Sequence, residues 1–298
     1  MWSAMEMVIM AFDCIALIVG GLGDVVVLAL CVLERSRKRV LCPYRVISLS
    51  VSISNLTAIF LQLASDNDLL SNTLLMQYVD LLSVSCLCSN LWFSTLLYVY
   101  YSIKIGARRL TFYTWLNAKF PTILPYLLFS LLTMSLLTSF IVLLQPLDNP
   151  PDNVSSALPT NYEEAYLENP FIKSGLTQSL IALICFLISF ILVGQILLSL
   201  YRHVRRLQSN NEAAGNFSLE AHFKAAKTLT ILLVFNVTFF VSMITTLLSP
   251  SPSMAFAISC IFIAVSLSTQ PYILILGNAN MMKQAKETFL HVFMKVAN

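Results

Sequence analysis

Seventeen of the eighteen Lys and Arg residues in this chain lie on one side of a series of seven uncharged, apolar stretches. Lys173 alone lies in a connection on the other side. Basic loops stay in the cytoplasm when a chain is inserted into a membrane, so this asymmetry predicts a membrane-spanning topology and also its direction. We expect the N-terminus outside the cell and the C-terminus in the cytoplasm.

The composition agrees with a membrane protein. The chain is 57% apolar and only 11% charged, whereas soluble domains carry about a quarter charged residues. Its formal net charge is +3, and the basic residues gather in short loops and in the tail. This distribution favours contact with membrane lipids and with a protein partner at the inner surface, and it argues against a nucleic-acid partner.

The distances between charged residues define the spans. A helix needs roughly 20 apolar residues to cross the hydrocarbon core. Between Arg45 and Asp66 there are 20 uncharged residues, and between Lys227 and Lys283 there are 55, enough for two helices separated by the proline-containing segment 249–253. We predict an all-α membrane protein with one domain over residues 1–298, a seven-transmembrane helix bundle followed by a short amphipathic tail helix. The helices are expected at about 5–33, 45–65, 73–103, 120–145, 172–202, 225–248 and 254–277, and the tail at 278–298.

The sequence gives no support for an enzyme. The three histidines, His203, His222 and His291, all fall at the predicted inner surface, and none pairs with a nucleophile inside a span. There is no His-Glu-x-x-His zinc motif, phosphate-binding loop or Cys-x-x-Cys pair. We therefore expect no catalytic residue, no metal and no cofactor.

The longest predicted outer loop, residues 146–172, carries a glycosylation signal but no cysteine. Asn-x-Ser/Thr matches occur at Asn55, Asn153, Asn216 and Asn236, and only Asn153 falls outside the membrane on the outer side. Because glycosylation takes place on that side, we predict a glycan on Asn153. The missing cysteine excludes the outer disulfide of most rhodopsin-like receptors.

Four motifs occur in order between Asn90 and Asn278. They are Asn90-Leu-Trp-Phe-Ser-Thr-Leu-Leu-Tyr-Val-Tyr-Tyr-Ser-Ile-Lys-Ile105, Leu197-Leu-Ser-Leu-Tyr-Arg-His203, Glu220-Ala-His-Phe-Lys-Ala-Ala-Lys-Thr228 and Ile273-Leu-Ile-Leu-Gly-Asn278. Together they resemble the signatures of the type 2 taste receptors, the bitter taste receptors. That family also lacks the outer disulfide, the Asp-Arg-Tyr motif and the Asn-Pro-x-x-Tyr motif, and this chain lacks all three.

The resemblance implies a G-protein-coupled chemoreceptor in the plasma membrane. Its partners would be a bitter small-molecule agonist, bound in the outer half of the bundle, and a gustducin-like heterotrimeric G protein. Two alternatives stay open. A type 1 vomeronasal-like receptor for semiochemicals usually keeps outer-loop cysteines, and a small membrane transporter would need polar groups along several helices.

The resemblance also assigns candidate site residues. Family positions that contact agonists correspond to Asp66, Ser83, Leu87 and Cys260, and helical spacing adds Phe239, Phe240 and Ile263 on the apolar side. None of the first four keeps the usual residue of the family. The residues expected to face the G protein are Lys104, Arg108, His203, Arg206, His222 and Lys227.

A polar pair in the membrane departs from the family pattern. Asp24 stands where the family usually has Asn in helix one, and Asn55 stands where it usually has Arg in helix two. A lone Asp inside a membrane helix costs several kcal/mol unless it has a partner. We therefore expect Asp24 to face the bundle interior and to meet Asn55, together with a group of helix seven or water. Such a hub would differ between the inactive and active packings.

Overall fold

The computed structural model describes residues 4–38, 41–66, 73–106, 111–143, 170–209, 216–249 and 253–297. These residues are almost entirely helical and contain no strand. The helices are α1 (Ala4–Lys38), α2 (Pro43–Asp66), α3 (Thr73–Gly106), α4 (Thr111–Leu143), α6 (Pro170–Ser209), α7 (Asn216–Leu248), α8 (Met254–Gly277) and α9 (Ala279–Ala297). All of these helices except α9, seven in number, are long and apolar enough to cross a membrane. The predicted seven-helix architecture is therefore confirmed.

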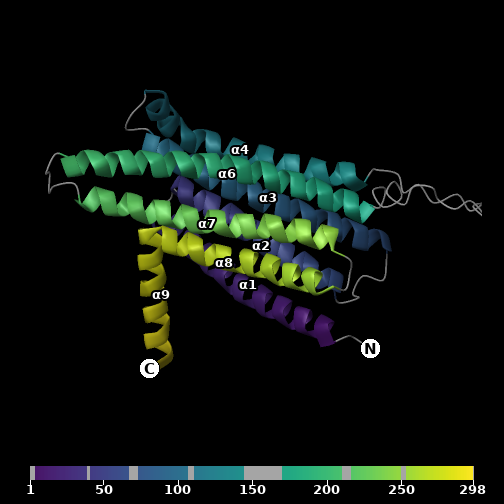
Figure 1. Cartoon of the computed structure of the whole chain (residues 1–298). Helices are drawn as coiled ribbons and strands as arrows, with labels where there is room; N and C mark the ends of the chain where they lie inside the picture. Colours follow the sequence, from purple (N-terminus) through teal and green to yellow (C-terminus); the bar gives the residue numbers. More distant parts are fainter. Residues whose placement is uncertain are drawn as a thin grey trace, which may run out of the picture.

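The seven long helices lie side by side, and α9 leaves them at a large angle (Figure 1). We call the end of the bundle from which α9 departs the α9 end, and the opposite end, where α1 begins, the N-terminal end. The predicted tail helix corresponds to α9. It is strongly amphipathic, and Phe289 and Leu290 are exposed on it.

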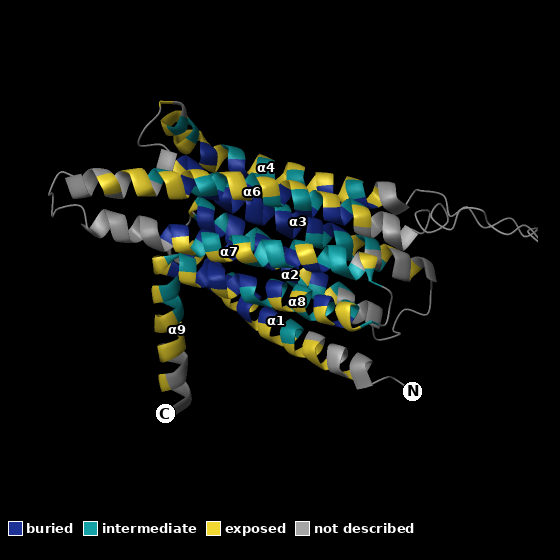
Figure 2. Ribbon diagram, in the orientation of Figure 1, coloured by how far each residue is buried: buried dark blue, intermediate teal, exposed yellow. Residues whose placement is uncertain are grey.

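The outward faces of the bundle are apolar, as lipid-facing helices require. Tyr126 and Phe129 of α4 are 75% and 72% exposed. In the hydrocarbon core no water is available to satisfy backbone N–H and C=O groups, so each apolar segment must form a helix that bonds to itself. Exposed side chains form long stripes on the outer helices, whereas α3 is mostly buried (Figure 2).

Helix α3 is the central element of the fold. In its membrane span 61% of the residues are buried, compared with 17% in α4. Its side chains Leu97 and Tyr98 belong to the main hydrophobic core together with Ile47 of α2, Leu229 of α7 and Leu274 of α8. This core extends to the α9 end, where Met281 of α9 belongs to it.

Two glycines allow α1 to approach α8 closely. A Cβ atom on Gly20 would lie 2.8 Å from the Ser268 Cα, and one on Gly23 would lie 2.8 Å from the Pro271 Cγ. Two hydroxyls donate hydrogen bonds across the same contact, from Ser268 Oγ to the Ala16 carbonyl and from Tyr272 Oη to the Val19 carbonyl, both at 2.7 Å. The close contact brings the middle of α1 beside the middle of α8.

The turn between α8 and α9 is fixed by one residue. The Asn278 side chain accepts hydrogen bonds from the backbone N–H groups of Asn280 and Met281, at 3.0 and 3.2 Å. Asn is a favoured N-cap because its side chain satisfies donors that have no partner within the helix. Met281 is fully buried beneath this turn, which anchors the first turn of α9 on the bundle.

Candidate functional site

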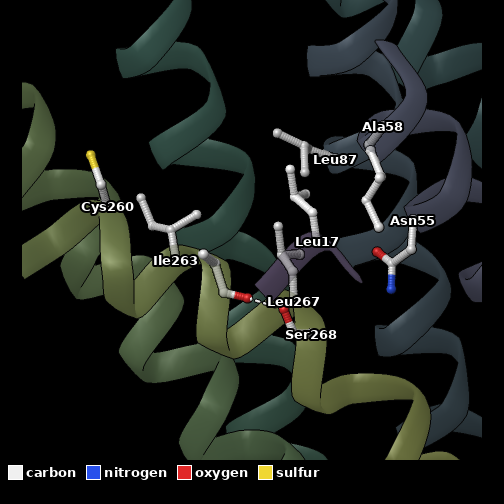
Figure 3. A pocket seen from close by; sticks show the side chains of 10 residues that line it. Leu17, Asn55, Ala58, Leu87, Cys260, Ile263, Leu267 and Ser268 are labelled. Atoms are coloured by element: carbon white, nitrogen blue, oxygen red, sulfur yellow. Dashed lines mark hydrogen bonds between the residues drawn. The ribbon is translucent and has the colours of Figure 1, made fainter. Parts of the chain in front are cut away.

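A cavity of about 160 Å³ lies between α1, α2, α3 and α8. In Figure 3 the side chains of Ile263 and Ser268 lie on one side of it and those of Ala58 and Asn55 on the other. Its wall is mainly apolar, with an amide, a hydroxyl and a thiol as the polar groups. The lining residues are Leu17, Asn55, Ala58, Ile59, Leu87, Cys260, Ile263, Ala264, Leu267 and Ser268.

A second and much smaller cavity adjoins the first. It measures about 10 Å³ and is bordered by α3, α7 and α8, which is space for about one water molecule. Leu87 and Leu267 border both cavities, and Phe239 and Asn236 border only the second. These two leucines therefore separate the larger cavity from α7.

The floor of the larger cavity belongs to a buried hydrogen-bond network. Asn90 Nδ2 donates to Asn55 Oδ1, and Asn55 Nδ2 donates to Gln270 Oε1 at 3.3 Å. Gln270 Nε2 then donates to Asn90 Oδ1 at 3.0 Å and to Ser94 Oγ at 2.6 Å. We call Asn55, Asn90, Ser94 and Gln270 the central network. It joins α2, α3 and α8, and its four side chains are buried.

Asp24 of α1 lies beside the central network. Its side chain is fully buried. The polar side chains next to its carboxyl group are those of Ser52 and Asn55. Neither carboxyl oxygen, however, has a hydrogen-bond partner of normal geometry among the described residues. The structure thus brings Asp24 and Asn55 together as a pair, with Gln270 as the group from the last span.

A separate contact connects α3 with α7. Asn236 Nδ2 donates to Tyr98 Oη at 3.1 Å, and Tyr98 is fully buried in the main core. Asn236 also borders the second cavity. Asn236 thus lies on the wall of the second cavity and also bonds to Tyr98 of α3.

The predicted agonist-contacting residues are distributed unevenly. Leu87, Cys260 and Ile263 lie together on the larger cavity, and Phe239 lies on the second. Phe240 stacks on Phe186 of α6, with ring centroids 6.3 Å apart. Ser83 is half-buried on α3 and is not among the residues that line either cavity. The side chain of Asp66 falls outside the described part of the chain.

Two of the predicted G-protein-facing residues can be placed. Lys104 and Lys227 are exposed near the α9 end, and Lys104 Nζ lies 5.5 Å from the Tyr100 ring centroid and donates to the Tyr100 hydroxyl at 3.3 Å. Arg108, Asn153 and the side chains of His203, Arg206 and His222 lie outside the described residues. The described residues contain no group of His, Cys, Asp and Glu that could hold a metal ion.

A buried ion pair holds the α9 end together. Arg45 of α2 pairs with Glu34 of α1, and it donates to the Leu30 carbonyl at 3.0 Å and to Gln284 Oε1 of α9 at 2.7 Å. We call Glu34, Arg45 and Gln284 the α9-end clamp. Arg45 marked the boundary of a span in the sequence, yet it is 1% exposed. A long side chain with a carboxylate partner on the adjacent helix can be buried where a single charge cannot.

Sequence reasoning missed Asn90, Ser94 and Gln270 as site residues. All three were visible as polar side chains inside apolar spans, and Gln270 lies in the 55-residue stretch without charge. Amides within membrane helices commonly bond to a neighbouring helix. A search for uncharged polar residues at mid-span, in addition to charges, would have found them.

The family described as "Taste receptor protein (TAS2R)" matches residues 1–294. A taste receptor type 2 member 10 from Pongo pygmaeus is 28% identical over 229 residues, which are 76% of this chain and 72% of that protein. Its Homo sapiens counterpart is 30% identical over 185 residues, 62% of this chain and 58% of the relative. The Homo sapiens taste receptor type 2 member 2 is 28% identical over 166 residues, 52% and 51% of the two chains. The alignments with the two human relatives therefore span little more than half of each relative.

Proposed function

The chain belongs to the taste receptor (TAS2R) family, and from this premise we propose that it is a G-protein-coupled chemoreceptor for bitter small molecules. Members of the family are receptors and not enzymes, and the chain is a multi-pass membrane protein. The match over residues 1–294 leaves the vomeronasal-type receptor and the transporter without support. We place the receptor in the plasma membrane.

The proposed orientation follows from the charge asymmetry. The α9 end carries the connections rich in Lys and Arg, and basic connections stay in the cytoplasm. We therefore assign the α9 end to the cytoplasm and the N-terminal end to the outside. Lys104 and Lys227, exposed near the α9 end, would then be available to a gustducin-like G protein.

The proposed agonist site is the larger cavity. Its apolar wall would bury a mainly apolar molecule, and the Asn55 amide and the Ser268 hydroxyl would orient a polar group of that molecule. The observation that carries the proposal is that Asn55 belongs both to the wall of the cavity and to the central network. An agonist that contacts Asn55 acts directly on the hydrogen bonds between α2, α3 and α8.

The proposed signal is a change in the packing of these helices. An agonist shifts the equilibrium only if it binds one arrangement better than the other. Contact with Asn55 would favour a different set of hydrogen bonds to Asn90 and Gln270. An agonist that contacts Leu87 would displace this side chain toward the second cavity, which Phe239 and Asn236 of α7 also line. Both effects would move α3 relative to α7, whose ends carry Lys104 and Lys227.

The test is calcium release in cells that express this chain with a gustducin-type G-protein chimera, challenged with a panel of bitter compounds. A saturable response, absent from mock-transfected cells, is expected. In the variant Ala264→Phe the added ring would fill the cavity, so the half-maximal agonist concentration should rise at least tenfold. The matched control is Ala255→Phe, which places the same ring on the exposed side of α8.

Membrane localisation of each variant is followed with a fluorescent protein fused to the C-terminus. An equal response of the Ala264→Phe and Ala255→Phe variants at equal localisation would place the agonist elsewhere in the bundle. Silence of the correctly localised wild-type chain across a broad bitter panel would count against the function itself.

A further inference from the structure

Among the described residues, no basic side chain lies beside the carboxylate of Asp24. The residue is fully buried in the middle of the α1 span, and both carboxyl oxygens lack a hydrogen-bond partner within the described residues. The basic residue within α2, Arg45, is paired with Glu34 instead. Because an isolated charge in a membrane interior costs several kcal/mol, a group that neutralises Asp24 is required.

A serine hydroxyl next to Asp24 also lacks a partner. Ser52 is fully buried and lies next to the Asp24 carboxyl group. Its hydroxyl has no hydrogen-bond partner of normal geometry among the described residues. Several serines of these spans donate to the carbonyl four residues earlier, as Ser50 does to Val46 at 3.0 Å and Ser189 does to Cys185 at 2.7 Å, whereas Ser48 of α2, like Ser52, has no partner among the described residues. Ser52 does not form that bond although its helix offers it. Its oxygen is therefore free to act as a ligand.

The neighbouring amide completes a set of oxygen atoms. Asn55 Oδ1 accepts one hydrogen bond, from Asn90, and an amide oxygen has two lone pairs. The Asp24 carboxylate, the Ser52 hydroxyl and the Asn55 amide oxygen thus come from two adjacent helices and have unused acceptor capacity. Ser52 and Asn55 both lie next to the Asp24 carboxyl group, so the three oxygen-bearing side chains are within reach of one shared ion.

We propose that Asp24, Ser52 and Asn55 bind one monovalent cation, with sodium as the ion that the oxygen donors fit. A single carboxylate balances a single positive charge. Calcium and magnesium are held by six or more oxygen atoms, usually from more than one carboxylate, and the described residues around Asp24 offer one carboxylate, its own. Since Asn55 also lines the larger cavity, the ion would lie between that cavity and α1. It would fix the orientation of the Asn55 amide and so of the central network.

The test uses the purified full chain in lipid nanodiscs, without agonist and without G protein, so its result does not depend on the proposed function. Unfolding is followed with a thiol-reactive fluorophore, because Cys31, Cys88 and Cys185 are buried and free and become accessible on unfolding. Sodium chloride is compared with potassium chloride and N-methylglucamine chloride at equal ionic strength. For an ion at about ten times its dissociation constant, sodium should raise the unfolding temperature by roughly 3–6 °C.

Three variants sharpen the test. Asp24→Asn should abolish the sodium effect, and Ser52→Ala should raise the half-saturating sodium concentration several-fold. Ser50→Ala, on the same helix but bonded to its own backbone, should leave that concentration unchanged. Identical unfolding temperatures of the wild type in all three salts would overturn the proposal and assign the neutralisation to a proton. A sodium effect that persists in Asp24→Asn would overturn it as well. If Asp24→Asn does not fold, the wild type and Ser52→Ala still decide.

Discussion

The central network and the α9-end clamp are both buried, but they are built from different chemistry. The central network joins α2, α3 and α8 through neutral side chains, each of which can donate and accept. The α9-end clamp joins α1, α2 and α9 through a buried ion pair. Amides can exchange partners at little cost. A buried ion pair cannot separate without leaving an uncompensated charge.

This difference assigns a separate role to each region. The α9-end clamp should hold the corner of α1, α2 and α9 in one geometry, and the central network should be the place where the packing changes. The position of the larger cavity agrees, since Asn55 of the central network lines it and no residue of the α9-end clamp does. Removing the clamp should therefore affect stability, and altering the network should affect the response.

The largest effect is expected from Arg45→Met. This change leaves the Glu34 carboxylate buried without its partner, which typically costs about 3–5 kcal/mol. The unfolding temperature should fall by on the order of 10 °C, measured with the thiol-reactive fluorophore in nanodiscs. The matched control is Lys283→Ala on α9, whose side chain is 78% exposed and lies 3.9 Å from Glu287. Exposed pairs contribute little, so the control should keep the wild-type temperature, and equal losses in both variants would remove the distinction.

A smaller effect on stability, but a larger one on the response, is expected from Gln270→Leu. Gln270 donates to Asn90 and Ser94 and accepts from Asn55, and the change leaves those buried groups without partners at about 1–3 kcal/mol. The half-maximal agonist concentration in the calcium assay should shift by at least tenfold. The adjacent Thr269→Ala is the control, because the Thr269 hydroxyl donates to the Val265 carbonyl of its own helix. A normal response of Gln270→Leu would mean that the central network is a static contact.

The number, order and character of the helices could be predicted because they depend on local properties. Segment length and the positions of charges decide where a helix can cross the membrane. The same rule was wrong in detail at Arg45, because it treats every charge as a water-facing boundary. The partner of Arg45 is Glu34, on the preceding helix, and only the packed structure brings the two together.

The candidate site could be predicted less completely, since it depends on which helices meet. Family motifs gave the register for Leu87 and Cys260, and helical spacing added Ile263; all three lie on one cavity. Leu17 of α1 could not be inferred in this way. It reaches the cavity because Gly20 and Gly23 allow α1 to pack closely on α8, and that contact is tertiary. Gln270 was missed because the sequence reasoning followed charges and not amides.

The smallest effects are expected from removing one tyrosine hydroxyl at the α9 end and one near the central network. The two changes should differ in their effect on the agonist response. Tyr44 Oη donates to the Leu274 carbonyl at 2.6 Å, in the last turn of α8, where carbonyls lack helical donors. Tyr98 Oη accepts from Asn236 of α7, which borders the second cavity. Each change to Phe should cost about 1 kcal/mol, or roughly 2–4 °C in unfolding temperature. Only Tyr98→Phe should also shift the half-maximal agonist concentration, because its contact joins the two helices that are proposed to move. A shift of equal size in Tyr44→Phe would show that the α9 end takes part in activation and does not merely hold the helices in place.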